Sequence, residues 1–224
     1  MRSTYFYFIC FLLCVSSLAA QTTNKTDSVK PKEIVKNSIG FDIDLVSIVT
    51  SALGTETYNF EGAVHYNIQN KYLAILECGL AGANKASATE VNFKTSAPFA
   101  KIGLDFNIVK PSVNPKNARN MFLLGARVGA TNFSYDISNY SVTDTAGVIT
   151  LQNYQNQNAT KLWFEIVASV RVDVYRNIYM GWSVRNKQLI TNDAIGAIVP
   201  WFIPGYGLNA SGNWGVNYVI GLRF

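Results

Sequence analysis

The last twelve residues, 213–224, constrain the fold most because apolar and polar side chains alternate along them. One parity is wholly apolar and consists of Trp214, Val216, Tyr218, Ile220, Leu222 and Phe224. The other parity is polar or glycine, with Val219 as the lone apolar member. A period of two belongs to a β-strand with one apolar and one polar face. The sequence therefore favours an all-β fold in which a protein core or lipid covers the apolar face.

Seven earlier segments show the same alternation, so we predict eight strands. The seven lie at residues 39–45, 57–68, 72–83, 100–108, 121–131, 162–174 and 178–187. The pattern is weakest in 72–83, where Leu73 and Ile75 share the parity of the polar residues. Most of the segments have close to the roughly 9–11 residues that a tilted strand needs to cross a bilayer.

The connections between these segments predict an up-and-down strand order. We expect tight turns at residues 69–71 and 176–177, and a linker at 110–119 whose two prolines exclude a strand. Long polar loops are expected at residues 84–96, 136–160 and 186–212. Short connections on one side and long ones on the other are typical of eight-stranded antiparallel transmembrane barrels.

Charged residues within a predicted strand share one parity wherever there is more than one, which places them on the lumen face. Eight strands enclose an interior just wide enough for side chains. We therefore expect the charges to pair with one another, fill the lumen and leave a barrel that conducts poorly or not at all. The predicted lumen network has seven acidic side chains, six basic ones and one histidine: Asp42, Asp44, Glu61, His65, Glu77, Lys101, Asp105, Arg127, Glu165, Arg171, Asp173, Arg185, Lys187 and Arg223.

A secreted antiparallel sandwich or a lipocalin-like barrel is the soluble alternative, because the same period places an apolar face inside. The many Tyr, Trp and Phe residues on the apolar parity exceed what a small barrel interior holds. Beyond the first twenty residues, no stretch is apolar for 18 residues, so helical membrane spans are not expected. The sequence thus favours the transmembrane barrel.

Residues 1–20 have the features of a secretory signal peptide: Met1-Arg2, an apolar run, and small residues before Gln21. Residues 21–37 are expected to form a flexible periplasmic tail, and residues 38–224 the barrel. Cleavage removes two of the three cysteines and leaves Cys78 alone, so no intramolecular disulfide is expected. Because His65 is the only histidine, we expect no metal site and no other cofactor.

The terminal strand resembles the assembly signal of bacterial outer-membrane β-barrels, with Trp214, Tyr218, Leu222 and Phe224 as its candidate residues. With the signal peptide, the strand pattern and the segment at residues 200–207, residues 38–224 resemble small eight-stranded outer-membrane barrels, in particular barrel families of Bacteroidota. The resemblance implies the outer membrane of a Gram-negative cell. It implies outer-membrane lipids and the barrel assembly machinery as partners, and it supplies no catalytic residues.

Three functions are compatible with such a barrel: an accessory protein that docks an outer-membrane protein partner, a lipid-modifying enzyme, or a narrow channel. His65 is the only candidate base for lipid chemistry. Its strand places it near the periplasmic end, so we expect an interior histidine bonded to neighbours such as Glu61 and no enzyme activity. The aromatic residues Trp201, Phe202 and Tyr206 are expected to form either an interfacial belt or a partner-docking surface.

Two short motifs, Asp27-Ser-Val29 and Asp144-Thr-Ala146, resemble the O-glycosylation motif of Bacteroidota and make Ser28 and Thr145 candidate acceptors.

Cleavage of the signal peptide leaves 18 basic and 14 acidic residues, without a long basic run. This balance is typical of a solvated surface and predicts no nucleic-acid partner.

Overall fold

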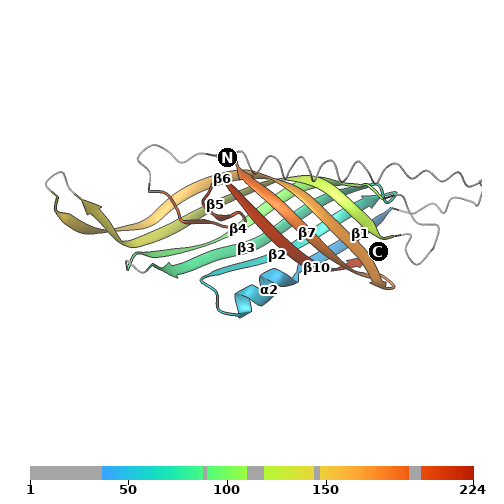
Figure 1. Ribbon diagram of the computed structural model, residues 1–224, viewed down its shortest axis with the longest axis horizontal. Helices are drawn as coiled ribbons and strands as arrows, with labels where there is room; N and C mark the ends of the chain where they lie inside the picture. The colour runs from blue at the N-terminus through green and yellow to red at the C-terminus, as the bar shows by residue number, and fades with distance from the viewer. Residues whose placement is uncertain (1–36, 88–89, 110–118, 144–146, 192–197) are drawn as a thin grey trace, which may run out of the picture. The chain divides into compact units, whose positions relative to one another are not determined.

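A computed structural model describes residues 37–87, 90–109, 119–143, 147–191 and 198–224, which lie within one compact unit. Its main sheet is a closed antiparallel barrel with the strand order β1-β10-β7-β6-β5-β4-β3-β2 (Figure 1). The predicted eight-stranded barrel is therefore confirmed. The strands are β1 Ser38–Asp44, β2 Thr57–Ile68, β3 Tyr72–Ala86, β4 Asn92–Asn107, β5 Met121–Thr143, β6 Ile149–Tyr175, β7 Ile178–Leu189 and β10 Gly212–Arg223.

The first and last strands close the ring. Residues of β1 pair antiparallel with β10 from Gly40 opposite Arg223 to Asp44 opposite Val219. Beyond the strand itself, Phe224 exchanges two backbone hydrogen bonds with Ile39, of 2.8 and 3.0 Å. This pairing leaves no open edge along β1, as a bilayer-spanning sheet requires.

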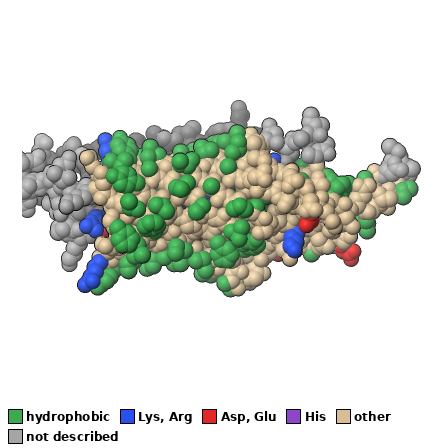
Figure 2. All heavy atoms as spheres, turned by 180° about the vertical axis from the view of Figure 1, so that it is seen from behind, with side chains coloured by type: hydrophobic (Ala, Val, Ile, Leu, Met, Phe, Trp, Pro, Cys, Tyr) green, Lys and Arg blue, Asp and Glu red, His purple; other side chains and the backbone are tan. Residues whose placement is uncertain are grey.

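The alternating apolar and polar side chains of each strand point to the outer face and to the lumen of the barrel, respectively. Outward-facing apolar side chains are well exposed, for example Ile102 and Trp182 at 66% each and Val216 at 60%. Hydrophobic side chains cover the barrel wall in Figure 2. The opposite parity is largely buried, and it includes the predicted network, of which twelve residues are buried and Asp173 and Lys187 are half-buried. A wall with an apolar outer face and a charged interior is that of a transmembrane barrel, not of a soluble one.

We call the two ends of the barrel the turn end, which carries the tight turns at 69–71 and 176–177, and the arm end opposite to it. At the turn end, Leu73 and Ile75 pack inside the barrel against Met121 and Leu123. This small apolar cluster explains why the alternation of β3 is weak in the sequence. The predicted linker at 110–119 lies outside the described residues except for Arg119.

Two predicted loops at the arm end are wrong. Residues 84–96 belong largely to β3 and β4, which pair as far as Ala86 opposite Asn92. Residues 136–143 and 149–160 form strands instead of a loop, since β5 continues to Thr143 and β6 starts at Ile149. These segments lack a regular alternation of apolar and polar residues along their length, and the prediction relied on one. Strands that project beyond the bilayer are solvated on both faces and need no such face.

A helix, α2 (Leu45–Ala52), was not predicted. Asp44 caps it by accepting a 3.1 Å hydrogen bond from the backbone N–H of Val46. Because β1 ends at Asp44, α2 follows it along the barrel wall and contacts the two strands on either side of β1, β2 and β10. Its Ser47 is buried, whereas Val49 is 56% exposed, so the helix repeats the polar-inside pattern of the strands. Among the described residues, no helix is both long and apolar enough to cross a membrane.

Candidate functional site

The centre of the lumen is a cluster of buried ion pairs around Arg185. Its Nη1 atom lies 2.6 Å from Glu77, 3.2 Å from Glu61 and 3.3 Å from Glu165. The three glutamates come from β2, β3 and β6, and Arg185 comes from β7. One guanidinium thus joins carboxylates from different parts of the wall. Such a group is satisfied only while all its partners stay in place.

Two further cations complete this central cluster. Lys101 Nζ lies 2.8 Å from Glu61 and 3.0 Å from Glu77. Arg127 contacts Glu77 at 3.1 Å and holds Asp105 with two nitrogens, Nη1 and Nη2. Paired hydrogen bonds of this kind between arginine and carboxylate are among the stronger charge-assisted contacts.

A second cluster lies toward the turn end and includes the single histidine. Arg171 contacts Asp42 at 2.8 Å, and its Nη1 lies 3.1 Å from Nε2 of His65. Tyr179 donates a hydrogen bond to Asp42 from the same layer. His65 is 1% exposed, which confirms the predicted interior position, but its partners are Asp42 and Arg171 and not Glu61. The expected Glu61 contact is wrong because Lys101 and Arg185 engage that carboxylate instead.

The remaining predicted network residues lie inside the barrel but form separate contacts. Arg223 pairs with Asp173 at 3.2 Å near the turn end. Asp44 is held by neutral groups, the Ser47 hydroxyl and the Asn217 amide, beside α2. Lys187 is 4.0 Å from Glu165. The fourteen residues therefore all face the lumen, although they do not form one continuous network.

Among the buried polar side chains absent from the predicted network are Lys161 (2% exposed) and Tyr179 (fully buried). Lys161 has the same parity as Glu165 and Arg171, but it lies beyond the predicted start of its strand. Tyr179 lies on the polar parity, where a phenol was not counted. With Lys161 included, the described interior has seven acidic and seven basic side chains.

Little free space remains between these groups. A cavity of about 30 Å³ is lined by Asp42, Glu61, Arg171 and Arg185 among others. That volume holds about two water molecules, at roughly 10–15 Å³ each on this measure. An interior filled in this way differs from the wide, water-filled lumen of a porin.

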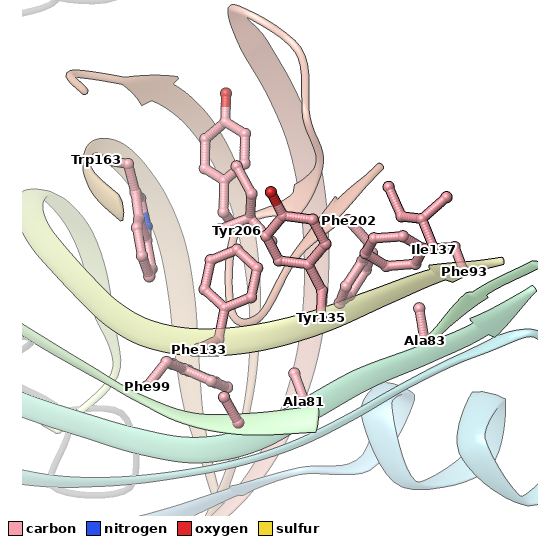
Figure 3. Close-up of a cluster of buried hydrophobic side chains, with 12 residues drawn as sticks. Ala81, Ala83, Phe93, Phe99, Phe133, Tyr135, Ile137, Trp163, Phe202 and Tyr206 are labelled. Atoms are coloured by element: carbon pink, nitrogen blue, oxygen red, sulfur yellow. The ribbon is translucent and has the colours of Figure 1, made fainter. Parts of the chain in front are cut away.

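The segment at residues 198–211 packs against the inner wall at the arm end of the lumen, and we call it the plug. Within it, β8 (Phe202–Ile203) and β9 (Gly207–Leu208) form a two-stranded sheet. Figure 3 shows Phe202 and Tyr206 among wall residues such as Phe133, Tyr135 and Trp163. Small wall residues, Ala81, Ala83 and Ala97, leave room for these rings.

The plug is fastened by specific contacts. Lys187 Nζ donates hydrogen bonds to the carbonyl oxygens of Gly205, at 2.8 Å, and Tyr206, at 3.3 Å. The Tyr206 ring packs edge-on against Trp163 at 5.9 Å between centroids. Gly205 has φ = 80° and faces Phe99, so a Cβ there would approach that ring to 2.4 Å.

This geometry corrects the prediction for Trp201, Phe202 and Tyr206. Phe202 is 7% exposed and Tyr206 is 1% exposed, so these side chains form neither an interfacial belt nor a docking surface. Trp201 is half-buried, with Lys85 over its ring at 4.6 Å. The aromatic residues turn inward because the arm end of the lumen offers an apolar cluster to pack against.

The candidate assembly residues of β10 lie on the outer face. Trp214 is 74% exposed, Leu222 46% and Phe224 70%. Tyr218 is half-buried against Trp182, with the rings edge-on at 5.5 Å. These positions agree with the strand register that the sequence predicts.

Deleting Phe224 is expected to abolish barrel formation, because the deletion removes the ring and both backbone hydrogen bonds to Ile39 that end the β1–β10 seam. Phe224→Ala keeps those backbone bonds and should retain part of the folded yield. Heat-modifiable migration in gel electrophoresis measures folding. Equal yields of folded barrel from the deletion and the wild type would contradict the proposed seam.

The arm is the end of the β5–β6 hairpin, residues 139–143 and 147–154 as described here. In the described chain, β4 stops pairing with β5 at Ser138, so the strands of the arm pair with each other alone. The arm projects past the other strands in Figure 1. Apolar side chains on it are as exposed as those of the wall, with Ile149 at 68% and Leu151 at 66%.

The candidate glycosylation sites Ser28 and Thr145 lie outside the described residues.

Solved structures similar to this chain are outer-membrane barrels. The major outer membrane protein of Thermus thermophilus matches with a TM-score of 0.51 and 10% identity, over 84% of this chain and 98% of that one. Ail, the attachment invasion locus protein of Yersinia pestis, matches with 0.41 and 12% over 84% and 96%. Neisserial surface protein A matches with 0.33 and 14% over 84% and 95%. At such low identity, the Thermus match shows the fold and not the function.

No curated protein is similar in sequence to this chain. The predicted link to Bacteroidota stays a prediction. A family model described as "Domain of unknown function (DUF6048)" matches residues 2–223, which is nearly the whole chain. The chain therefore belongs to the DUF6048 family.

Proposed function

We propose that this protein is a non-conducting barrel of the outer membrane that serves as an accessory protein and docks a partner at the cell surface. The observation that carries this proposal is a contrast between two parts of the barrel. The lumen is filled by paired charges and capped by the plug, while β5 and β6 extend as an arm beyond it. A closed lumen favours binding outside the barrel over transport through it.

The outer-membrane location is supported by the apolar wall and by the predicted signal peptide. With both ends of the barrel chain at the turn end, that end would face the periplasm and the arm the cell exterior. The Thermus protein shares this barrel fold and is described as an outer membrane protein. We propose the same compartment for this chain.

The arm is our proposed docking surface, in place of the buried plug residues. Ile149 and Leu151 are exposed on a hairpin where β5 and β6 pair only with each other among the described residues. Lipid does not account for their exposure if the arm stands outside the bilayer. Neighbouring apolar side chains that stay exposed to water as one patch are typical of protein interaction sites.

The proposal is tested by placing a photo-reactive amino acid at Leu151 and, as a matched control, at Ile102, which has the same 66% exposure on the barrel wall. In intact cells, the label at Leu151 should give one reproducible protein adduct, and the label at Ile102 should give lipid adducts. The docking function is wrong if Leu151 also yields lipid alone. An identical protein adduct from both positions would assign the partner to the membrane-embedded wall.

The enzyme alternative leads to a separate prediction about His65. Its ring is held by Asp42 and Arg171 inside the barrel, away from the arm end. His65→Asn is therefore expected to leave the lipid composition of the outer membrane unchanged. Mass spectrometry of extracted lipids makes the comparison. A lipid species present in the wild type and lost in His65→Asn would favour a lipid-modifying enzyme.

A further inference from the structure

Charges on the outer surface of the barrel are segregated by end. The turn end carries three exposed cations, Lys71, Arg119 and Arg176. The described residues place no acidic side chain on the outer surface there, since Asp173 pairs with Arg223 inside. In Figure 2, Lys and Arg side chains gather at the left end, beyond the hydrophobic wall.

The arm end has the opposite balance. Its surface cations have acidic neighbours, with Lys85 at 2.8 Å from Glu56 and Lys94 opposite Asp136 in the sheet register. Glu90 adds a further exposed acid. An anionic surface is therefore attracted to the turn end and not to the arm end.

Aromatic contacts set the depth of the turn-end cations. Lys71 Nζ lies over the Tyr72 ring at 5.1 Å, and the Arg176 guanidinium lies over the Tyr175 ring at 5.2 Å. Both tyrosines are exposed, at 39% and 59%. Tyrosines at this place on a barrel form the girdle at the membrane–water interface. Cations stacked on them lie at the depth of the lipid headgroups.

The backbone keeps these charges at the rim. Lys71 closes the β2–β3 turn, in which Gln69 and Asn70 adopt left-handed φ values of 52° and 57°. Its N–H donates a 2.9 Å hydrogen bond to the Ile68 carbonyl. Arg176 lies in the two-residue β6–β7 turn, also with positive φ. The charges are thus fixed within two residues of the strands.

We propose that Lys71, Arg119 and Arg176 form a basic rim that binds the headgroups of anionic phospholipids in the leaflet at the turn end. The ligand atoms are the phosphate oxygens, which accept charge-assisted hydrogen bonds from ammonium and guanidinium groups. Each cation near an anionic leaflet favours such lipids by about fivefold. This site is independent of the arm, although the proposed orientation assigns it to the periplasmic leaflet.

The test measures which lipids the barrel retains. The full chain is reconstituted in nanodiscs of equal phosphatidylcholine and phosphatidylglycerol, then extracted gently, and the retained lipids are counted by mass spectrometry. The wild type should retain phosphatidylglycerol in an excess of up to about a hundredfold if three contributions of about fivefold add. The excess should fall in high salt, which screens exposed charges. The triple variant K71Q/R119Q/R176Q should retain the two lipids equally.

The control variant K85Q/K94Q removes the same kind of charge from the arm end and should keep the wild-type excess. Heat-modifiable migration verifies that both variants are folded. If the triple variant fails to fold, single K71Q or R176Q variants replace it, and each should lower the excess of retained phosphatidylglycerol about fivefold. Equal retention by the wild type overturns the basic rim, as does an excess that survives in the triple variant. If the photo-reactive label at Leu151 gives no protein adduct, that result contradicts the docking proposal and leaves the basic rim unaffected.

Discussion

Replacing Arg185 with alanine is expected to lower the free energy of unfolding by about 3–5 kcal/mol, the cost of removing one partner of a buried ion pair. Arg185 is 6% exposed and contacts Glu61, Glu77 and Glu165 within 3.3 Å. Without it, three cations, Lys101, Arg127 and Lys187, remain for the carboxylates of Glu61, Glu77, Glu165 and Asp105.

Urea unfolding of the barrel reconstituted in phosphatidylcholine alone, which gives the basic rim no anionic lipid to bind, measures this loss. Arg176→Ala is the matched control, since this arginine is exposed at a turn and its replacement should change the free energy by less than about 0.5 kcal/mol. Adding Glu61→Gln to Arg185→Ala restores the charge balance and should recover part of the stability. Equal stability of Arg185→Ala and Arg176→Ala would contradict the buried network.

The second large effect is expected at Ile102 on the outer wall of β4. Ile102→Arg places a charge against the acyl chains and should destabilise the barrel by about 2–4 kcal/mol if the residue lies near the bilayer midplane. Ile149→Arg is the matched control on the arm, because the two isoleucines are 66% and 68% exposed. In water the same substitution should be nearly neutral.

Folded yield in vesicles and unfolding in urea measure both variants. Equal destabilisation at Ile102 and Ile149 would place the arm inside the bilayer and remove the argument for docking. Neutral substitutions at both positions would contradict the lipid-facing wall itself.

Strand periodicity predicted the barrel because lipid requires one apolar face on each crossing strand. That requirement ends where the strands leave the bilayer, so the continuation of β5 to Thr143 and of β6 back to Ile149 lacks the signal. The helix α2 was missed because its eight residues follow β1 directly, and Leu45 fits the alternation of that strand. A cap residue at Asp44 followed by the helical face of Val46 and Val49 was the available signal.

The lumen residues were predictable as a set but not as pairs. Parity places Glu61 and His65 inside, yet partners across the barrel depend on side-chain length and on the tilt of the strands. His65 therefore meets Arg171, which is 106 residues away in the chain. The prediction that the aromatic residues of the plug lie at a surface was wrong for a related reason. Aromatic residues suit an interface and a core equally well, and the space left by Ala81 and Ala97 at the arm end of the lumen decides between them.

Single-channel recording in planar bilayers tests the closed lumen most directly. The purified wild-type barrel should give no stable openings, and neither should a variant in which residues 199–209 of the plug are replaced by a short Gly-Ser linker. The second result is expected because the ion pairs of Lys101, Arg127 and Arg185 lie below the plug and stay in place. Stable openings from the pure wild-type protein would contradict the account and identify a channel.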